Sequence, residues 1–328
     1  MIKRALWLLL LMTLGAGGWL AYFLSTPVAL PVTPFEFDVK SGITMKRVAQ
    51  QLAQAGVLKQ PFAFTLAARL TGKGSALKAG NYALNEPLTP WELLQKLTKG
   101  DVTQSEIKFI EGWNFKQLRQ ALDSAPNLQH DTRGLSDAEI MAKLGWPKQH
   151  PEGRFFPDTY FFSHGMSDLA ILGRAHKLMQ THLENVWRER AANLPYDTMN
   201  KALIMASIIE KETGQAAERP MIAGVFINRL HSGMLLQTDP TVIYGLGDRY
   251  DGNLHKRDLL DDTPYNTYLR AGLPPTPIAM PGIEALRAAV NPAPTRALYF
   301  VARGNGTHKF SASLAEHNQA VNKYQRQQ

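Results

Sequence analysis

An uncharged and almost wholly apolar run opens the chain. It covers residues 5–24 and follows two basic residues, Lys3 and Arg4. About 20 apolar residues suffice for a helix to cross a bilayer, so the run predicts a membrane anchor over residues 1–25. A cleaved signal peptide is the alternative, but its apolar region would be shorter, about 7–15 residues, and residues 27–29 make a poor cleavage site. Under the positive-inside rule the basic residues stay cytoplasmic and the rest of the chain is exported.

A small unit follows the anchor. Prolines predict a stiff tether over residues 26–34, and the unit itself is expected over residues 35–104. Alternation of apolar and polar residues indicates strands, and apolar residues three or four apart indicate helices. In order, the pattern predicts a strand at 35–39, helices at 45–55 and 61–70, a returning strand at 79–84 and a third helix at 90–97.

The remainder of the chain, residues 105–328, is expected to form one larger α+β domain. A strand is predicted at 106–110, followed by helices at 115–122, 169–194, 199–213, 218–231 and 283–289. A hairpin is predicted around Gly304-Asn305-Gly306. The segment between residues 233 and 281 is rich in Pro, Gly and Tyr and is expected to hold little regular structure. The fold class is therefore α+β, with an N-terminal transmembrane helix.

Composition narrows the function classes. The 328 residues are 45% hydrophobic, which favours packed domains over disorder, and the chain has no cysteine, which excludes disulfides, a thiol nucleophile and Cys-ligated metals. The net charge of +8 suits an anionic partner, although a solvated basic surface explains it equally well. No nucleic-acid motif accompanies the charge, so no nucleic-acid partner is expected. Zinc-hydrolase, serine-elbow and phosphate-loop motifs are also missing, and neither a metal nor an organic cofactor is expected.

The segment from Ala202 to Thr213 contains the strongest candidate for a catalytic residue. It begins almost wholly apolar, which predicts a buried helix. None of the residues on the helical face of Glu210 (Leu203, Ala206 and Ser207) is cationic. Burial without a partner on its own helix would raise the pKa of Glu210 and suit this side chain to act as a general acid.

Two other interpretations of this segment stay open. Glu210 could instead be the first exposed residue at the end of a core helix, paired with Lys211 or Arg219. Glu212 is a weaker candidate acid, because its neighbours Lys211 and Thr213 indicate solvent.

The chain after this helix is expected to supply a saccharide groove. Sugars are bound by ring stacking together with amide and hydroxyl contacts, and this region mixes those groups. The predicted substrate-binding residues are Asn228, Gln237, Thr238, Asp239, Tyr244, Tyr265, Asn266 and Tyr268. The alternative is that Asp239-Pro240 and Asn266-Thr267 serve only as turn and cap residues.

Two resemblances add to this interpretation. Residues 37–52 resemble the opening of a LysM module, a small strand–helix–helix–strand unit that binds glycan chains; a docking domain that binds no sugar is the alternative. Several long motifs resemble those of the YceG-like endolytic murein transglycosylases. They lie at residues 152–160, 206–213, 225–230, 236–245, 265–268, 272–278 and 316–318, and the second reads Ala-Ser-Ile-Ile-Glu-Lys-Glu-Thr.

The second resemblance implies an activity. In that family the catalytic residue is the first glutamate of Glu-Lys-Glu-Thr, which is Glu210 here. The implied reaction is non-hydrolytic cleavage between N-acetylmuramic acid and N-acetylglucosamine within peptidoglycan glycan strands, leaving 1,6-anhydro ends. The implied location is the bacterial inner membrane, with a cytoplasmic N-terminus, a periplasmic catalytic domain and peptidoglycan synthases as partners. The alternatives are a non-catalytic peptidoglycan-binding scaffold and a muramidase that uses water.

Overall fold

The computed structural model describes residues 2–40, 42–100 and 104–325. The chain divides into two compact units, one comprising Met1–Glu106 with Phe161–Met166 and the other Ile107–Tyr160 with Ser167–Gln328. The predicted border between the small and the large unit, at residues 104 and 105, adjoins residues 101–103, which lie outside the described part of the chain, so it stays a prediction.

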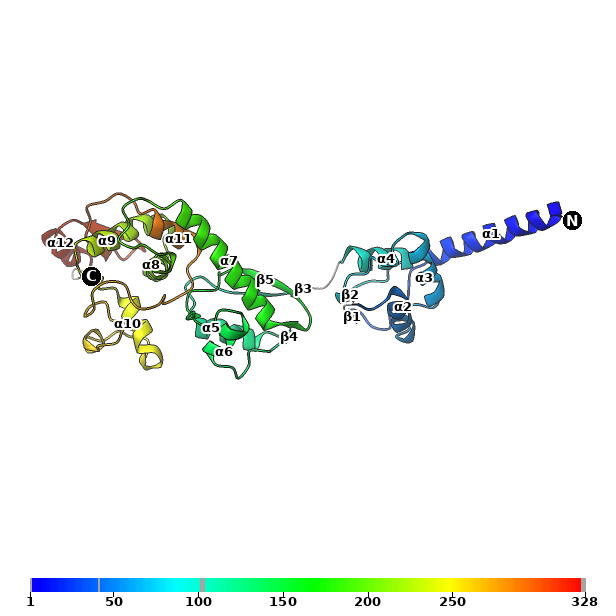
Figure 1. Ribbon diagram of the computed structural model, residues 1–328, viewed down its shortest axis with the longest axis horizontal. Helices are drawn as coiled ribbons and strands as arrows, with labels where there is room; N and C mark the ends of the chain where they lie inside the picture. Colours follow the sequence, from blue (N-terminus) through cyan, green and yellow to red (C-terminus); the bar gives the residue numbers. More distant parts are fainter. Residues whose placement is uncertain (1, 41, 101–103, 326–328) are drawn as a thin grey trace. The chain divides into compact units, whose positions relative to one another are not determined.

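The first unit begins with the apolar helix α1 (Figure 1). It continues in the predicted order with a strand, two helices, a second strand and a third helix: α1 Ile2–Ser25, β1 Phe35–Val39, α2 Met45–Gln54, α3 Pro61–Leu70, β2 Gly80–Leu84 and α4 Pro90–Lys99. Strands β1 and β2 pair antiparallel, with Phe37 opposite Tyr82. The helices pack an apolar core on these strands, in which Val48, Leu52 and Leu94 are fully buried.

Local sequence explains where these elements begin and end. Thr44 accepts a hydrogen bond from the backbone of Arg47 and so caps α2, and Thr89 forms a reciprocal capping box with Glu92 at the start of α4. Gly100 ends α4 with a φ of 80°, which a glycine adopts without strain. In α1, Leu6–Ser25 is long and apolar enough to cross a membrane, a property it shares with signal sequences, and none of it is buried within the protein.

The rest of the chain is a helical assembly with short two-stranded sheets (Figure 1). Its elements are β3 Gln104–Lys108, α5 Phe115–Ser124, β4 Leu128–Gln129, α6 Asp137–Lys143, β5 Thr159–Ser163, β6 Met166–Ser167, α7 Asp168–Arg188, α8 Met199–Glu212, η1 Ala216–Glu218, α9 Arg219–His231, α10 Asp239–Leu246, η2 Gly247–Arg249, η3 Asp258–Leu260, α11 Ile283–Val290, β7 Tyr299–Ala302, β8 His308–Ser311 and α12 Leu314–Gln325. The strands pair as β3–β5, β4–β6 and β7–β8. The predicted mixed α+β class is confirmed.

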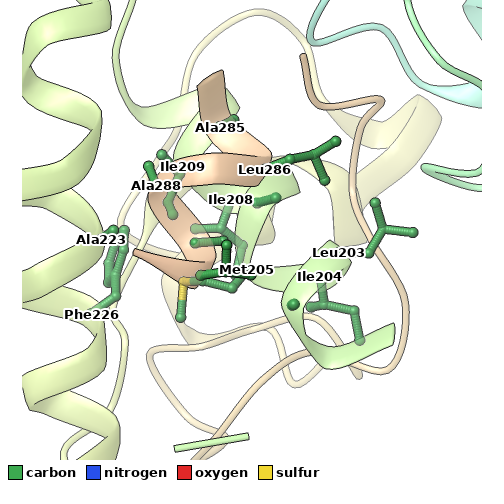
Figure 2. Packing of buried hydrophobic residues seen from close by; sticks show 14 of the residues in the cluster. Leu203, Ile204, Met205, Ile208, Ile209, Ala223, Phe226, Ala285, Leu286 and Ala288 are labelled. Carbon is green, nitrogen blue, oxygen red and sulfur yellow. The ribbon is translucent and has the colours of Figure 1, made fainter. Parts of the chain in front are cut away.

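Helix α8 lies at the centre of this unit. Every residue from Ala202 to Ile209 is buried, because α8 packs against α7, α9, α10 and α11. Figure 2 shows apolar side chains of α8, α9 and α11 gathered in one cluster. Ser207 interrupts the apolar run, and it satisfies its hydroxyl by donating to the Ile204 carbonyl at 2.7 Å and accepting from the Ile278 N–H at 3.0 Å. The predicted buried helix is thus confirmed.

Some predicted boundaries are wrong. Helix α7 ends at Arg188 instead of extending to Leu194. The segment expected to lack regular structure contains α10, which starts at Asp239 with Pro240 in its first turn, a position where proline's missing N–H costs nothing. The short helix α6 and the C-terminal α12 were not predicted, because each carries only a brief apolar pattern.

Candidate active site

Glu210 lies in the last turn of α8 with only 5% of its side chain exposed. Its Oε1 accepts a hydrogen bond from Nη2 of Arg219 at 2.8 Å. Its Oε2 accepts from the backbone N–H of Gly282, which caps α11, at 2.9 Å. The last turn of α8, the start of α9 and the start of α11 therefore meet at one carboxyl group.

The pKa of Glu210 lies above its ordinary value. Burial is the main cause, since it disfavours the charged form, and the nearby carboxylate of Glu111 acts in the same direction. The Gly282 N–H and the Arg219 guanidinium oppose this shift without cancelling it. The carboxyl group can therefore hold a proton closer to neutral pH than a free glutamate.

The surroundings of Glu210 contain features of both interpretations of the sequence, the buried acid and the ion-paired glutamate. Burial was expected and is found, but the side chain is also paired with Arg219, which the alternative had assumed only for an exposed glutamate. Arg219 begins α9 and is itself 10% exposed. Because Arg219 lies on the following helix, the residues on the Glu210 face of α8 did not indicate this partner. Lys211 points elsewhere, with its Nζ donating to the Gly112 carbonyl at 3.3 Å.

A second carboxylate near this site was missed in the sequence. Oε2 of Glu111 lies 3.8 Å from Nη2 of Arg219, and the Glu111 side chain is 49% exposed. The loop that carries it is held by two backbone hydrogen bonds, from Gly112 N–H to the Met280 carbonyl at 2.9 Å and from Met280 N–H to the Trp113 carbonyl at 2.7 Å. A single glutamate before a glycine is too weak a pattern to have identified it.

The prediction that Glu212 faces solvent is wrong. Its side chain accepts a hydrogen bond from the hydroxyl of Thr238, and burial raises its pKa to about 7. The nearby charge of Asp239 acts in the same direction. Thr238 lies 26 positions further along the chain, so the residues adjacent to Glu212 could not indicate this cover.

Three of the predicted substrate-binding residues, Gln237, Asp239 and Tyr268, line one cavity of about 450 Å³. Glu212 and Arg229 line it too, whereas Glu210 does not. The Tyr268 hydroxyl donates to Oδ1 of Asp239 at 2.5 Å, and Gln237 adopts a left-handed φ of 49°. The cavity thus gathers rings and hydrogen-bonding groups of the kind a saccharide needs.

Another predicted residue, Tyr244, contacts both a buried acid and the predicted residue Tyr265. Their rings meet edge to face with centroids 4.8 Å apart. The Tyr244 hydroxyl donates to Oε2 of Glu152 at 3.0 Å, and the Phe115 N–H donates to Oε1 of the same carboxyl at 3.0 Å. Burial raises the pKa of Glu152 to about 7. Glu152 lies in the motif at residues 152–160, but no role was predicted for it from the sequence.

The remaining predicted residues, Asn228, Thr238 and Asn266, bond to the protein itself. The amide of Asn228 donates to the carbonyls of Thr295 and Ala297, and Thr238 is buried against Glu212. Asn266 is fully buried, and its amide nitrogen donates to two backbone carbonyls of its own loop. These contacts favour the alternative in which Asn266 and its neighbours hold turns, and a substrate contact by these side chains stays a prediction.

Comparison with known proteins gives one family. The YceG-like family model matches residues 37–323. The chain is 33% identical to the endolytic murein transglycosylase of Bacillus subtilis, over 89% of this chain and 85% of that one. It is 26% identical to the endolytic murein transglycosylase of Streptococcus pneumoniae, over 90% of this chain and 60% of that one. A crystal structure of a YceG-like protein from Listeria monocytogenes superposes with a TM-score of 0.57 at 28% identity, covering 87% and 98% of the two chains. The chain therefore belongs to the YceG-like family.

Proposed function

We propose that this protein is an endolytic lytic transglycosylase of peptidoglycan in which Glu210 is both the acid and the base. The names of its relatives support the activity. The observation that carries the role of Glu210 is its geometry: a carboxyl with 5% exposure whose two oxygens meet a cation and a backbone N–H. Burial favours the protonated form, and these two donors stabilise the carboxylate that remains after the proton has left.

The reaction needs one group that gives and then takes a proton. Protonated Glu210 would donate its proton to the glycosidic oxygen between N-acetylmuramic acid and N-acetylglucosamine as the C1–O bond breaks. The resulting carboxylate would then take the proton of the muramic acid C6 hydroxyl while that oxygen bonds to C1. The product is a 1,6-anhydro end, and Glu210 regains its proton. An intramolecular nucleophile needs no bound water and has a high effective concentration.

The finer parts of the proposal concern substrate and location. We place glycan contacts at Gln237, Asp239 and Tyr268, which line the same cavity, and at the Tyr244–Tyr265 ring pair. We propose that α1 anchors the chain in the inner membrane with its N-terminus cytoplasmic and the catalytic unit periplasmic, since the helix is apolar and exposed along its length. Glycan binding by the LysM-like unit and association with peptidoglycan synthases are part of the same proposal.

A hydrolytic muramidase is the second candidate, because Glu111 places another carboxylate near Glu210. Glycosidases that use water carry two carboxyl groups, one acid and one base. Both glutamates lie within 4 Å of the same nitrogen of Arg219. If Glu111 activated water, the products would carry reducing ends in place of 1,6-anhydro ends.

Product analysis separates these functions. Purified full-length protein in detergent would be incubated with isolated peptidoglycan, and the released fragments would be analysed by mass spectrometry. Anhydro ends support the proposal, reducing ends support the muramidase, and the absence of fragments leaves a binding scaffold. Glu210→Gln should lower the rate by about 100- to 10,000-fold, the usual contribution of a general acid. Glu184→Gln, on the exposed surface of α7, is the matched control. Normal cleavage by the Glu210→Gln variant would reject the role assigned to Glu210.

A further inference from the structure

We propose that Glu111 is a positioning residue for Glu210: it shares the guanidinium of Arg219 with Glu210 and so limits how strongly that cation holds Glu210 as a carboxylate. The inference rests on the proposed function, in which Glu210 must carry a proton before each cleavage. It assigns a role to a residue that neither sequence motifs nor a direct hydrogen bond to Glu210 had singled out.

The geometry places one cation between two carboxyl groups. Nη2 of Arg219 lies 2.8 Å from Oε1 of Glu210 and 3.8 Å from Oε2 of Glu111. The Arg219 side chain is only 10% exposed, and its Nε has no hydrogen-bond partner among the described residues. The ion pairs with these two carboxyl groups are therefore the charged contacts of this guanidinium in the described part of the chain.

Charge balance explains what the second carboxylate does. A buried arginine beside a single glutamate makes a neutral pair when the glutamate is ionised, which removes the reason for the glutamate to hold a proton. With two glutamates, neutrality is reached when one of them is protonated. Glu210 is 5% exposed, whereas Glu111 is 49% exposed, and burial disfavours the charged form of a carboxyl group. Burial therefore favours the protonated form of Glu210, the residue that needs the proton in the proposed function.

The fold reserves space for Glu111 at this position. Gly282, which donates its N–H to Glu210, has a φ of −76°, a value that any residue adopts, so backbone conformation does not require glycine there. A Cβ at position 282, however, would collide with the carboxylate of Glu111. Alanine at this position would displace Glu111 while retaining every charge and the N–H that Glu210 accepts.

The other groups near Glu210 do not duplicate this effect. Arg219 comes from α9, Glu111 from the loop before α5, and the Gly282 N–H from the start of α11. Lys211, on α8 itself, is exposed and donates to the Gly112 carbonyl. Glu111 is thus the charge whose removal should alter the proton affinity of Glu210 without touching its hydrogen bonds.

The test is the pH profile of cleavage. The rate should fall as pH rises through the pKa of Glu210, because only the protonated form donates. Removing the negative charge of Glu111 lowers that pKa, so the descending limb should move to lower pH by about half to one pH unit, while the plateau on its acid side keeps its height. At pH values above the pKa of Glu210, the protonated fraction of Glu210 falls tenfold per pH unit. The shift therefore corresponds there to a loss of about 3- to 10-fold in kcat/KM.

The variants would be Glu111→Gln, Gly282→Ala and their combination, each as full-length protein in detergent, assayed on isolated peptidoglycan from pH 5 to pH 9. Both single variants should move the limb in the same direction, and the combination should move it no further than Glu111→Gln alone. Glu184→Gln should leave the profile unchanged. Thermal unfolding of each variant would establish that it is folded.

Several results would overturn the inference. An unchanged profile for Glu111→Gln would make Glu111 an ordinary surface carboxylate. A lower plateau with an unmoved limb would make it a substrate contact, and a change from one kind of product end to the other would make it the base for water. Failure of the proposed function is distinguishable from all of these, because wild-type protein would then give no anhydro ends or the Glu210→Gln variant would still cleave.

Discussion

Replacing Glu152 with glutamine should remove a pH-dependent loss of stability from the folded protein. Glu152 is 3% exposed, and its carboxyl group accepts hydrogen bonds from the Phe115 N–H and the Tyr244 hydroxyl. Burial outweighs these donors and raises its pKa from 4.5 to about 7. Glutamine has nearly the same shape and can keep both contacts, since the tyrosine hydroxyl can also accept a hydrogen bond.

The sign and size of the effect follow from proton linkage. A carboxyl group whose pKa is raised by folding binds more protons in the folded state between the two pKa values, so stability is lost as pH rises through that window. At about 1.4 kcal/mol per pKa unit, a rise from 4.5 to about 7 costs the folded state about 3 kcal/mol in total. About 2.5 kcal/mol of this loss should fall between pH 5 and pH 8.

The assay is urea unfolding of the full-length protein in detergent at pH 5 and pH 8, followed by tryptophan fluorescence. Relative to wild type, the Glu152→Gln variant should gain about 2.5 kcal/mol between the two pH values. Glu212, whose pKa is also raised to about 7, contributes equally to both proteins and cancels. A gain below about 0.5 kcal/mol would mean that Glu152 is already ionised in the folded protein, and the account of its burial would be refuted.

Three further predictions concern the anchor and the central helix. Ser207→Ala should cost about 1–3 kcal/mol in urea unfolding, because the buried Ile278 N–H loses its acceptor; an unchanged midpoint would contradict this. Glu210→Gln should become more stable relative to wild type as pH rises from 5 to 8 in thermal unfolding, because its raised pKa makes ionisation costly; the opposite trend would show that pairing with Arg219 dominates. Deleting residues 1–25 should give a protein that is soluble without detergent and still cleaves isolated peptidoglycan, and precipitation of this protein would argue that α1 also supports the fold.

Features that depend on local pattern were accessible from the sequence. The buried nature of α8 follows from its almost wholly apolar run, and the strand–helix–helix–strand order of the first unit follows from alternation, caps and glycines. The burial of Glu210 was predictable for the same reason, since its neighbours one turn back on α8 are all core residues. The helix α10 was missed because its segment is rich in Pro, Gly and Tyr, although Pro240 occupies the first turn of a helix.

Features that depend on distant partners were not accessible. Glu212 has a lysine and a threonine beside it in sequence, yet Thr238 and α10 cover it in the fold. Glu111 and Glu152 precede the core helix by many residues, and only the packing of their loops brings them to Arg219 and Tyr244. Sequence can therefore indicate the candidate carboxyl group, whereas the charges that shift its pKa come from elements brought together by folding.

The placement of Glu210 between two helix ends has a consequence for the proton transfers that we propose for it. The last turn of α8 presents the negative end of a helix dipole to the carboxyl group, and the N-cap of α11 presents a positive end to its Oε2. One field favours the neutral acid and the other the anion. Both dipoles are fixed by the packing of α8 against α11. In the proposed reaction the proton would therefore leave and return without the surrounding groups reorienting, which would lower the reorganisation energy of each proton transfer.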